Sequence, residues 1–174
     1  MQNQKHLPKA PQEFDEKVIR ISRVSKKTKG GNKMGFTALV VVGDRKGRVG
    51  VGLGKAKDVS SAIKKGVRRG KKSLIQIPLI DNRTLPHQTY VKYGAARLLI
   101  KPAPAGTGVI AGGSIRAVLE LAGVRDVVAK SLGTSNKMSN VIATFDALRT
   151  MKTTMMIKEA LGQSRKTKPP VITK

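Results

Sequence analysis

The sequence contains no cysteine, which excludes disulfides and thiolate metal sites and fits a protein of a reducing compartment such as the cytoplasm. Aromatic residues make up only 3% of the chain, so the core must be built from aliphatic side chains. No apolar run approaches the length that spans a bilayer, and the amino terminus has no apolar segment typical of a secretory signal. These absences predict a cytoplasmic protein with no membrane partner.

Acidic residues are also scarce. Ten Asp and Glu stand against 35 Lys and Arg, which gives a formal net charge of +25. Such an excess opposes compaction, and the phosphates of nucleic acid relieve it best. The two histidines lie far apart and the acids form no metal-ligand pattern, so we expect no catalysis, metal or cofactor. With so few rings available for base stacking, the composition favours shape-reading of double-stranded RNA.

The order of the apolar segments predicts an α+β fold of two small domains, residues 14–77 and 78–162, between basic tails at 1–13 and 163–174. Strands are expected at residues 17–24, 35–44, 49–54, 90–101 and 124–132. Helices are expected after Asp58, after Ser114 and after Asn136 or Ser139, with a short last helix at 156–161. Residues 102–114 are expected to form a loop, and Gly123 to end the helix that follows it.

Two features of the first domain indicate how it binds nucleic acid. The stretch SRVSKKTKGGNKMGF, residues 22–36, carries five cations and no acid, and we expect a long hairpin loop that a polyanion holds in shape. The helix after Asp58 places its cations on the arc opposite its apolar side. Glycines alternate through VGVGLG, residues 49–54, which predicts close approach of another backbone.

The stretch from Gly106 to Ala111 has the glycine spacing of a dinucleotide-binding loop, and Asp126 follows at a suitable distance. However, four residues separate the preceding strand from Gly106, whereas in a true fingerprint the glycines form the turn itself. We therefore favour a loop shaped for close backbone approach. A nucleotide-dependent enzyme using this loop is one alternative function, and a free-standing nucleic-acid-binding protein is another.

Taken together, these segments resemble the small-subunit ribosomal protein S-five family of bacterial type over nearly all of residues 17–148. The resemblance is carried by SRVSKKTKGG, FTALVVVGDRKGRVGVGLGKAKDV, GAARLLIKPAPAGTGVIAGGSIRAVLELAGVRDVVAKSLG and ATFDAL. It implies an N-terminal domain similar to a double-stranded-RNA-binding domain, with three antiparallel strands and a helix. It also implies a C-terminal βαβ-containing domain with a left-handed crossover.

The resemblance implies a structural, non-enzymatic role in the small ribosomal subunit, present as a single copy without homo-oligomers. The family binds small-subunit ribosomal RNA, contacts the proteins S-four and S-eight, and influences head–body conformation and decoding accuracy. By position, residues 23–33 resemble a loop that reaches into the RNA, while Gly106, Gly108 and Arg116 resemble the contact with S-four. The chain departs from the family at Asn32, Lys33 and Ile142, where arginines are usual. The RNA-binding residues expected here are Arg20, Arg23, Lys26, Lys27, Lys29, Gly30, Gly31, Lys33, Arg45, Lys55, Lys57, Lys64, Lys65, Arg68, Arg69, Lys72 and Thr107.

Overall fold

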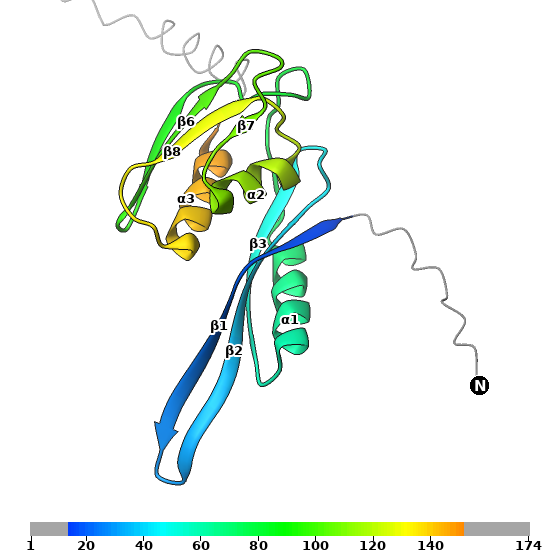
Figure 1. The fold of residues 1–174 in the computed structure, drawn as a ribbon. Coiled ribbons are helices and arrows are strands. Elements are labelled where there is room, and N and C mark those ends of the chain that lie inside the picture. Colours follow the sequence, from blue (N-terminus) through cyan, green and yellow to red (C-terminus); the bar gives the residue numbers. More distant parts are fainter. Residues whose placement is uncertain (1–13, 152–174) are drawn as a thin grey trace, which may run out of the picture.

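The computed structural model describes residues 14–151, which form two four-stranded sheets and three helices (Figure 1). The first sheet has the order β1 (Asp15–Thr28), β2 (Gly31–Gly43), β3 (Arg48–Ala56), β4 (Ile75–Gln76), antiparallel throughout. The second has the order β5 (Thr89–Tyr93), β6 (Ala96–Pro102), β8 (Val127–Ser131), β7 (Val109–Ile110). The helices are α1 (Val59–Lys72), α2 (Gly113–Ala122) and α3 (Lys137–Thr150). The predicted α+β class is confirmed.

Strand β2 is buried on both faces along its second half, as its unbroken apolar run predicts. Ala38, Val40 and Val42 face α1 and form a small core with Ala62. Leu39 and Val41 point to the opposite face, where they join a larger core made mainly by the second sheet and its helices. One strand therefore contributes to both cores, and the two sheets share a continuous apolar interior.

Helix α1 lies against β3 with almost no side chain between the two backbones. A Cβ atom added at Gly52 would lie 1.9 Å from the carbonyl oxygen of Gly66, and one added at Gly54 would lie 1.9 Å from that of Ala62. The alternating glycines of β3 thus meet a helix face that is itself made of small residues. This confirms the predicted close approach and identifies α1 as the partner.

The turn between β2 and β3 joins the two sheets by docking on the end of α2. The Arg45 N–H donates to the Leu121 carbonyl at 3.0 Å, and the Gly47 N–H donates to the Ala122 carbonyl at 2.9 Å. A Cβ at Gly123 would lie 2.3 Å from the Arg45 carbonyl oxygen, so this contact is also backbone against backbone. Gly123 has φ +88°, which glycine adopts readily, and ends α2 as predicted.

The second sheet carries α2 and α3 on one face, and no other helix or strand of residues 14–151 covers its opposite face (Figure 1). Strands β7 and β8 pair in parallel around α2, so the expected βαβ unit is present. Along β6 the buried residues Ala96, Leu98 and Ile100 alternate with outward-facing ones, as expected for a sheet covered on one side.

Several expected boundaries are corrected. Strand β7 lies inside the loop expected at 102–114, because Val109 and Ile110 pair with β8, and β4 adds a fourth strand to the first sheet. Helix α2 begins after Gly112, two residues before the position expected from Ser114 as its cap. Asn136 caps α3 with its side chain, whereas Asp58 precedes α1 without a capping bond. The helix expected at 156–161 and both tails lie outside the described residues. In residues 14–151, no helix combines the length and apolarity that crossing a bilayer requires.

We expect Gly52→Ala to lower the free energy of unfolding by about 3 kcal/mol or more, because the methyl group must displace backbone and not a movable side chain. Urea unfolding followed by circular dichroism measures this. Gly113→Ala is the matched control, since its Cβ meets no atom within 4 Å and alanine favours helix. Equal stability of the two variants would contradict the backbone contact described above.

Candidate nucleic-acid interface

The basic stretch at residues 22–36 is a paired β-ribbon, which corrects the expected long loop. Strands β1 and β2 remain in register from Ser22↔Thr37 to Thr28↔Gly31, leaving only Lys29 and Gly30 as the turn. Gly31 has φ +119°, and the Thr28 hydroxyl donates to its carbonyl at 2.7 Å. A backbone ladder therefore continues along this segment as far as its two-residue turn.

The far part of this ribbon projects beyond the rest of the sheet. The β2–β3 pairing begins at Phe36↔Ala56, so Gly31 to Gly35 pair with β1 alone. Five residues at about 3.3 Å each give a two-stranded extension of ~17 Å, visible at the lower end of β1 and β2 in Figure 1. Lys26 lies directly opposite Lys33 in this extension. Like charges directly opposite are destabilising, and isolated two-stranded ribbons are marginal, so anions near the tip would stabilise it.

The predicted cations of the ribbon are all exposed but are divided between its two faces. Arg23 pairs with Phe36 and Lys27 with Asn32. Both partners lie on the same face of β2 as the residues that contact α1, so these two cations point to the α1 side of the sheet. Arg20, Lys26 and Lys33 occupy the alternate positions and so point to the opposite face. Phosphates on either side of the ribbon can therefore meet a cation.

Helix α1 presents the second predicted group of cations. Its buried residues Ala62, Gly66 and Gly70 face the sheet, so its charged side chains point outward. The exposed cations of α1 are Lys64, Lys65, Arg68, Arg69, Lys71 and Lys72. Lys71 differs from the others because its ammonium lies 3.2 Å from the carboxylate of Glu16 on β1. The glycine contact with β3 fixes the direction in which the remaining five project.

Most acids of the described chain are occupied by ion pairs elsewhere. The carboxylates in these pairs belong to Asp15, Glu16, Asp44, Glu120 and Asp126. Within residues 14–151, no ion pair involves the ribbon cations from Arg20 to Lys33, or any α1 cation apart from Lys71. The ribbon and the outer face of α1 therefore keep an uncompensated positive charge.

The other predicted RNA-binding residues have different surroundings. Lys55 and Lys57 are exposed near the end of β3 and the start of α1. Arg45 lies in the turn that docks on α2, with φ +55°, and its guanidinium pairs with Asp15 at 2.7 Å. The Thr107 hydroxyl donates to the Pro104 carbonyl at 2.9 Å. Arg45 and Thr107 are thus engaged within the protein and lie apart from the ribbon and α1.

The Gly106–Gly108 loop is closed around a carboxylate of the protein itself. Both backbone N–H groups donate to Oδ1 of Asp126 at 3.0 Å, and the Arg83 guanidinium donates to Oδ2 at 3.0 Å. The Asp126 side chain is only 3% exposed. The Gly108 N–H holds the pKa of Asp126 below its ordinary value of 3.8, assisted by Arg83 and Gly106, although burial opposes the shift. The donors that a dinucleotide phosphate would need are occupied, which argues against the nucleotide-enzyme alternative.

Arg116, predicted to contact a protein partner, forms an ion pair with Glu120 at 2.7 Å. Glu120 also pairs with Lys17 of β1 at 3.0 Å and so links α2 to the first sheet. The hydrogen bond from Arg116 is the main cause that lowers the pKa of Glu120, and Lys17 adds to it. Arg116 keeps 56% of its side chain exposed, so an acidic partner can still reach it.

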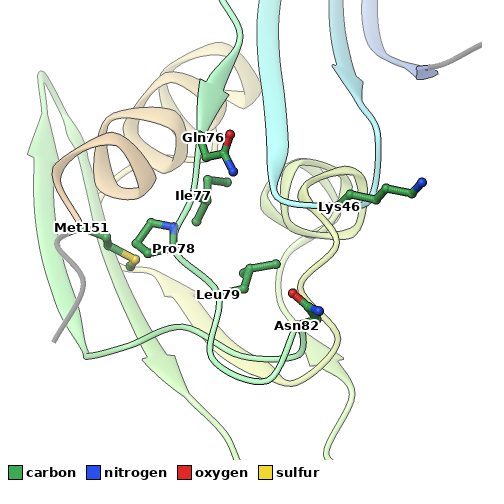
Figure 2. Close-up of a pocket in the computed structure, with 7 residues that line it drawn as sticks. All are labelled: Lys46, Gln76, Ile77, Pro78, Leu79, Asn82 and Met151. Carbon is green, nitrogen blue, oxygen red and sulfur yellow. The ribbon is translucent and has the colours of Figure 1, made fainter. Parts of the chain in front are cut away.

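A hollow of about 470 Å³ lies between the β2–β3 turn, the end of β4 with the segment that follows it, and the end of the described chain (Figure 2). Its lining residues are Lys46, Gln76, Ile77, Pro78, Leu79, Asn82 and Met151. Lys46 is the single ionisable group among them, so this hollow offers no acid–base pair. Residues 14–151 contain no group of three or more side chains suited to hold a metal ion.

Two carboxylates hold the Gly106–Gly108 loop and α2 in place, and the sequence does not reveal these roles. Spacing relates Asp126 only to a dinucleotide-binding loop, and no motif includes Glu120. Their partners lie far away along the chain: Arg83 is 43 residues from Asp126, and Lys17 is 103 residues from Glu120. Periodicity and motif spacing carry no information about contacts over such separations.

We expect Asp126→Ala to accelerate amide hydrogen exchange at Gly106 and Gly108, because both N–H groups lose their acceptor.

Since the pKa of Asp126 is lowered in the folded protein, its charged carboxylate stabilises the fold above pH 3.8, the ordinary pKa. This contribution is lost as the pH falls through the folded pKa. Urea unfolding between about pH 2 and pH 7 measures this. The free energy of unfolding of Asp126→Asn should be lower than that of the parent at neutral pH, and the difference should close in acid. Asp81→Asn, at an exposed acid that forms no ion pair within residues 14–151, should leave the profile unchanged. A gap that persists at low pH would contradict the assigned role of the charge.

Comparisons with family models and with individual known proteins point to the same family. Family models for ribosomal protein S5 match residues 14–78 (N-terminal domain) and 91–161 (C-terminal domain). A protein from Thermosynechococcus vestitus named small ribosomal subunit protein uS5 is 53% identical over 147 residues, covering 84% of each chain. Its namesake in Bartonella bacilliformis is 55% identical over 137 residues, covering 79% of this chain and 72% of the relative. In Emiliania huxleyi, a protein named small ribosomal subunit protein uS5c is 48% identical over 141 residues, covering 81% of this chain and 89% of the relative. The chain therefore belongs to the ribosomal protein S5 family.

Proposed function

We propose that this protein is a structural, non-enzymatic constituent of the small ribosomal subunit in the cytoplasm, where it binds and stabilises small-subunit ribosomal RNA. The proposal rests on one observation: the ribbon and the outer face of α1 carry cations that no acid of residues 14–151 compensates. Its relatives carry the matching name. The chemistry is electrostatic docking: Lys and Arg neutralise phosphates and release counterions.

In this proposal the two cationic surfaces have different tasks. The five outward cations of α1 sit on a helix fixed by backbone contact, so they meet phosphates with little rearrangement. The ribbon is narrow and has cations on both faces, which suits insertion between RNA segments. Bridging separate RNA elements in this way would steady the relation of head to body and so influence decoding accuracy.

The proteins S-four and S-eight are the proposed protein neighbours, with one copy of this chain in each subunit. Gly106, Gly108 and Arg116 lie at one end of the second sheet, on a loop held by Asp126 and on the first turns of α2. A partner would meet a preorganised backbone there, which limits the entropy lost on binding.

A free-standing RNA-binding protein is the second candidate function, since uncompensated cations alone do not select one RNA.

Replacing Lys64, Arg68 and Lys72 together by Gln should weaken binding to small-subunit ribosomal RNA and lower the salt slope by about one unit per lost phosphate contact. Filter binding across a salt titration measures both quantities. The matched control replaces Lys92, Arg97 and Lys101 by Gln, which removes the same charge from β5 and β6. If both triple variants behave alike, net charge and not the α1 face determines binding. Competition with an unrelated RNA duplex separates ribosomal specificity from general RNA binding.

Lys33→Glu should have opposite effects on the free and the bound protein. In the free protein, the new carboxylate faces Lys26 and replaces repulsion with attraction, so amide exchange in the ribbon should slow. Binding to ribosomal RNA should weaken, because a cation becomes an anion. Lys92→Glu, at an exposed lysine of the second sheet, is the charge-matched control and should leave ribbon exchange unchanged. Tighter RNA binding by Lys33→Glu would overturn the proposed role of the tip.

A further inference from the structure

The uncovered face of the second sheet has a defined arrangement of outward side chains. In β5 and β6 the pairs Tyr90↔Leu99 and Lys92↔Arg97 both point outward, and Leu99 also pairs with Lys130 of β8. In the next row, Lys101 pairs with Val128, and Val128 with Ile110 of β7. The inward residues of the same strands are buried under α2 and α3.

These pairings place one apolar outward residue on each strand, in a stripe that crosses the whole sheet. From β5 to β7 the stripe consists of Tyr90, Leu99, Val128 and Ile110. Tyr90 is 58% exposed, Ile110 55% and Val128 37%, with Leu99 partly buried between them. Large apolar side chains gathered on an open sheet face are typical of an interaction site.

Cations flank this stripe, with no acid among the outward positions of the four strands. Lys92, Arg97 and Lys130 lie along one side and Lys101 along the other. All four are exposed, and none belongs to an ion pair within residues 14–151. An apolar centre with a charged rim is the usual anatomy of a protein interface, where Tyr and Arg are enriched.

We propose that this face docks an amphipathic segment of a neighbouring protein, whose apolar residues lie on the stripe and whose acidic residues flank it. Three inter-strand spacings of about 4.8 Å, with a shift of two residues along the strands between Leu99 and Val128, make the stripe ~16 Å long, close to the length of three turns of helix. RNA suits the face less well, because three of the four stripe residues are aliphatic and offer no ring for base stacking. The inference rests on the proposed function only in placing the protein beside other subunit proteins.

Charge also argues against occupants supplied by the protein itself. Residues 152–174 contain six Lys and Arg and one Glu, so they would be repelled by the flanking cations. A second copy of the chain brings a net charge of +25 and no acid on the matching face. The occupant is therefore expected to be another protein with an acidic surface.

Site-specific photocrosslinking in assembled small subunits tests the proposal. The full-length protein, with photoreactive benzoylphenylalanine replacing Tyr90, is incorporated in cells, and purified subunits are irradiated. The expected product is an adduct to another protein that survives ribonuclease, with a crosslinked peptide that carries both apolar and acidic residues. An RNA adduct, an adduct within the chain or to a second copy, or no adduct overturns the proposal.

The same probe at Met34, exposed on the ribbon, is the control for the proposed function and should give an RNA adduct. Failure at Met34 counts against RNA binding by the ribbon, whereas failure at Tyr90 alone counts against the docking surface.

Adding Ile110→Asp to the Tyr90 probe should lower the yield of the adduct about tenfold, because the substitution places a carboxylate on the stripe. Ile80→Asp makes the same change at an exposed isoleucine outside the strands of this sheet and should leave the yield unchanged. Equal yields from the two Asp variants contradict the stripe as the contact.

Discussion

The contact between the backbones of β3 and α1 is the constraint on which the first sheet depends. Gly50, Gly52 and Gly54 remove the side chains from the middle of one face of the strand, so the helix approaches until carbonyl oxygens occupy the positions where Cβ atoms would stand. Such a contact allows little rotation or sliding, since there is no side chain to repack. The cations of α1 therefore have a fixed direction, although each of them is exposed and makes few contacts of its own.

A second contact of the same kind holds the two sheets together. The β2–β3 turn meets the end of α2 through main-chain hydrogen bonds and through glycines at positions 43 and 123, where a Cβ would lie within 2.3 Å of a neighbouring carbonyl oxygen. The Lys17–Glu120 pair and the shared interior of Leu39 and Val41 add to it. The two halves thus behave as one folded body, even though each has its own sheet.

Much of this arrangement could be predicted from the sequence, because it depends on local pattern. The alternating glycines predicted a close backbone approach, and the apolar run of β2 predicted a strand buried on both faces. The sequence predicts a loop and not a ribbon at 22–36, because the consecutive polar residues from Ser25 to Lys29 lack the apolar period that marks a strand. The Asp126 clamp was not predictable, since Gly106, Arg83 and Asp126 come together only through the tertiary fold.

The rigid joint between the sheets has a mechanical consequence. The ribbon tip and the Gly106–Gly108 loop lie at opposite ends of a body whose two joints are made of main chain. A push on that loop cannot be absorbed by side-chain rearrangement at these joints, so it must turn the whole molecule. Once anions hold its two strands together, the long ribbon acts as a lever arm, which converts a small displacement at one end into a larger sweep at the other.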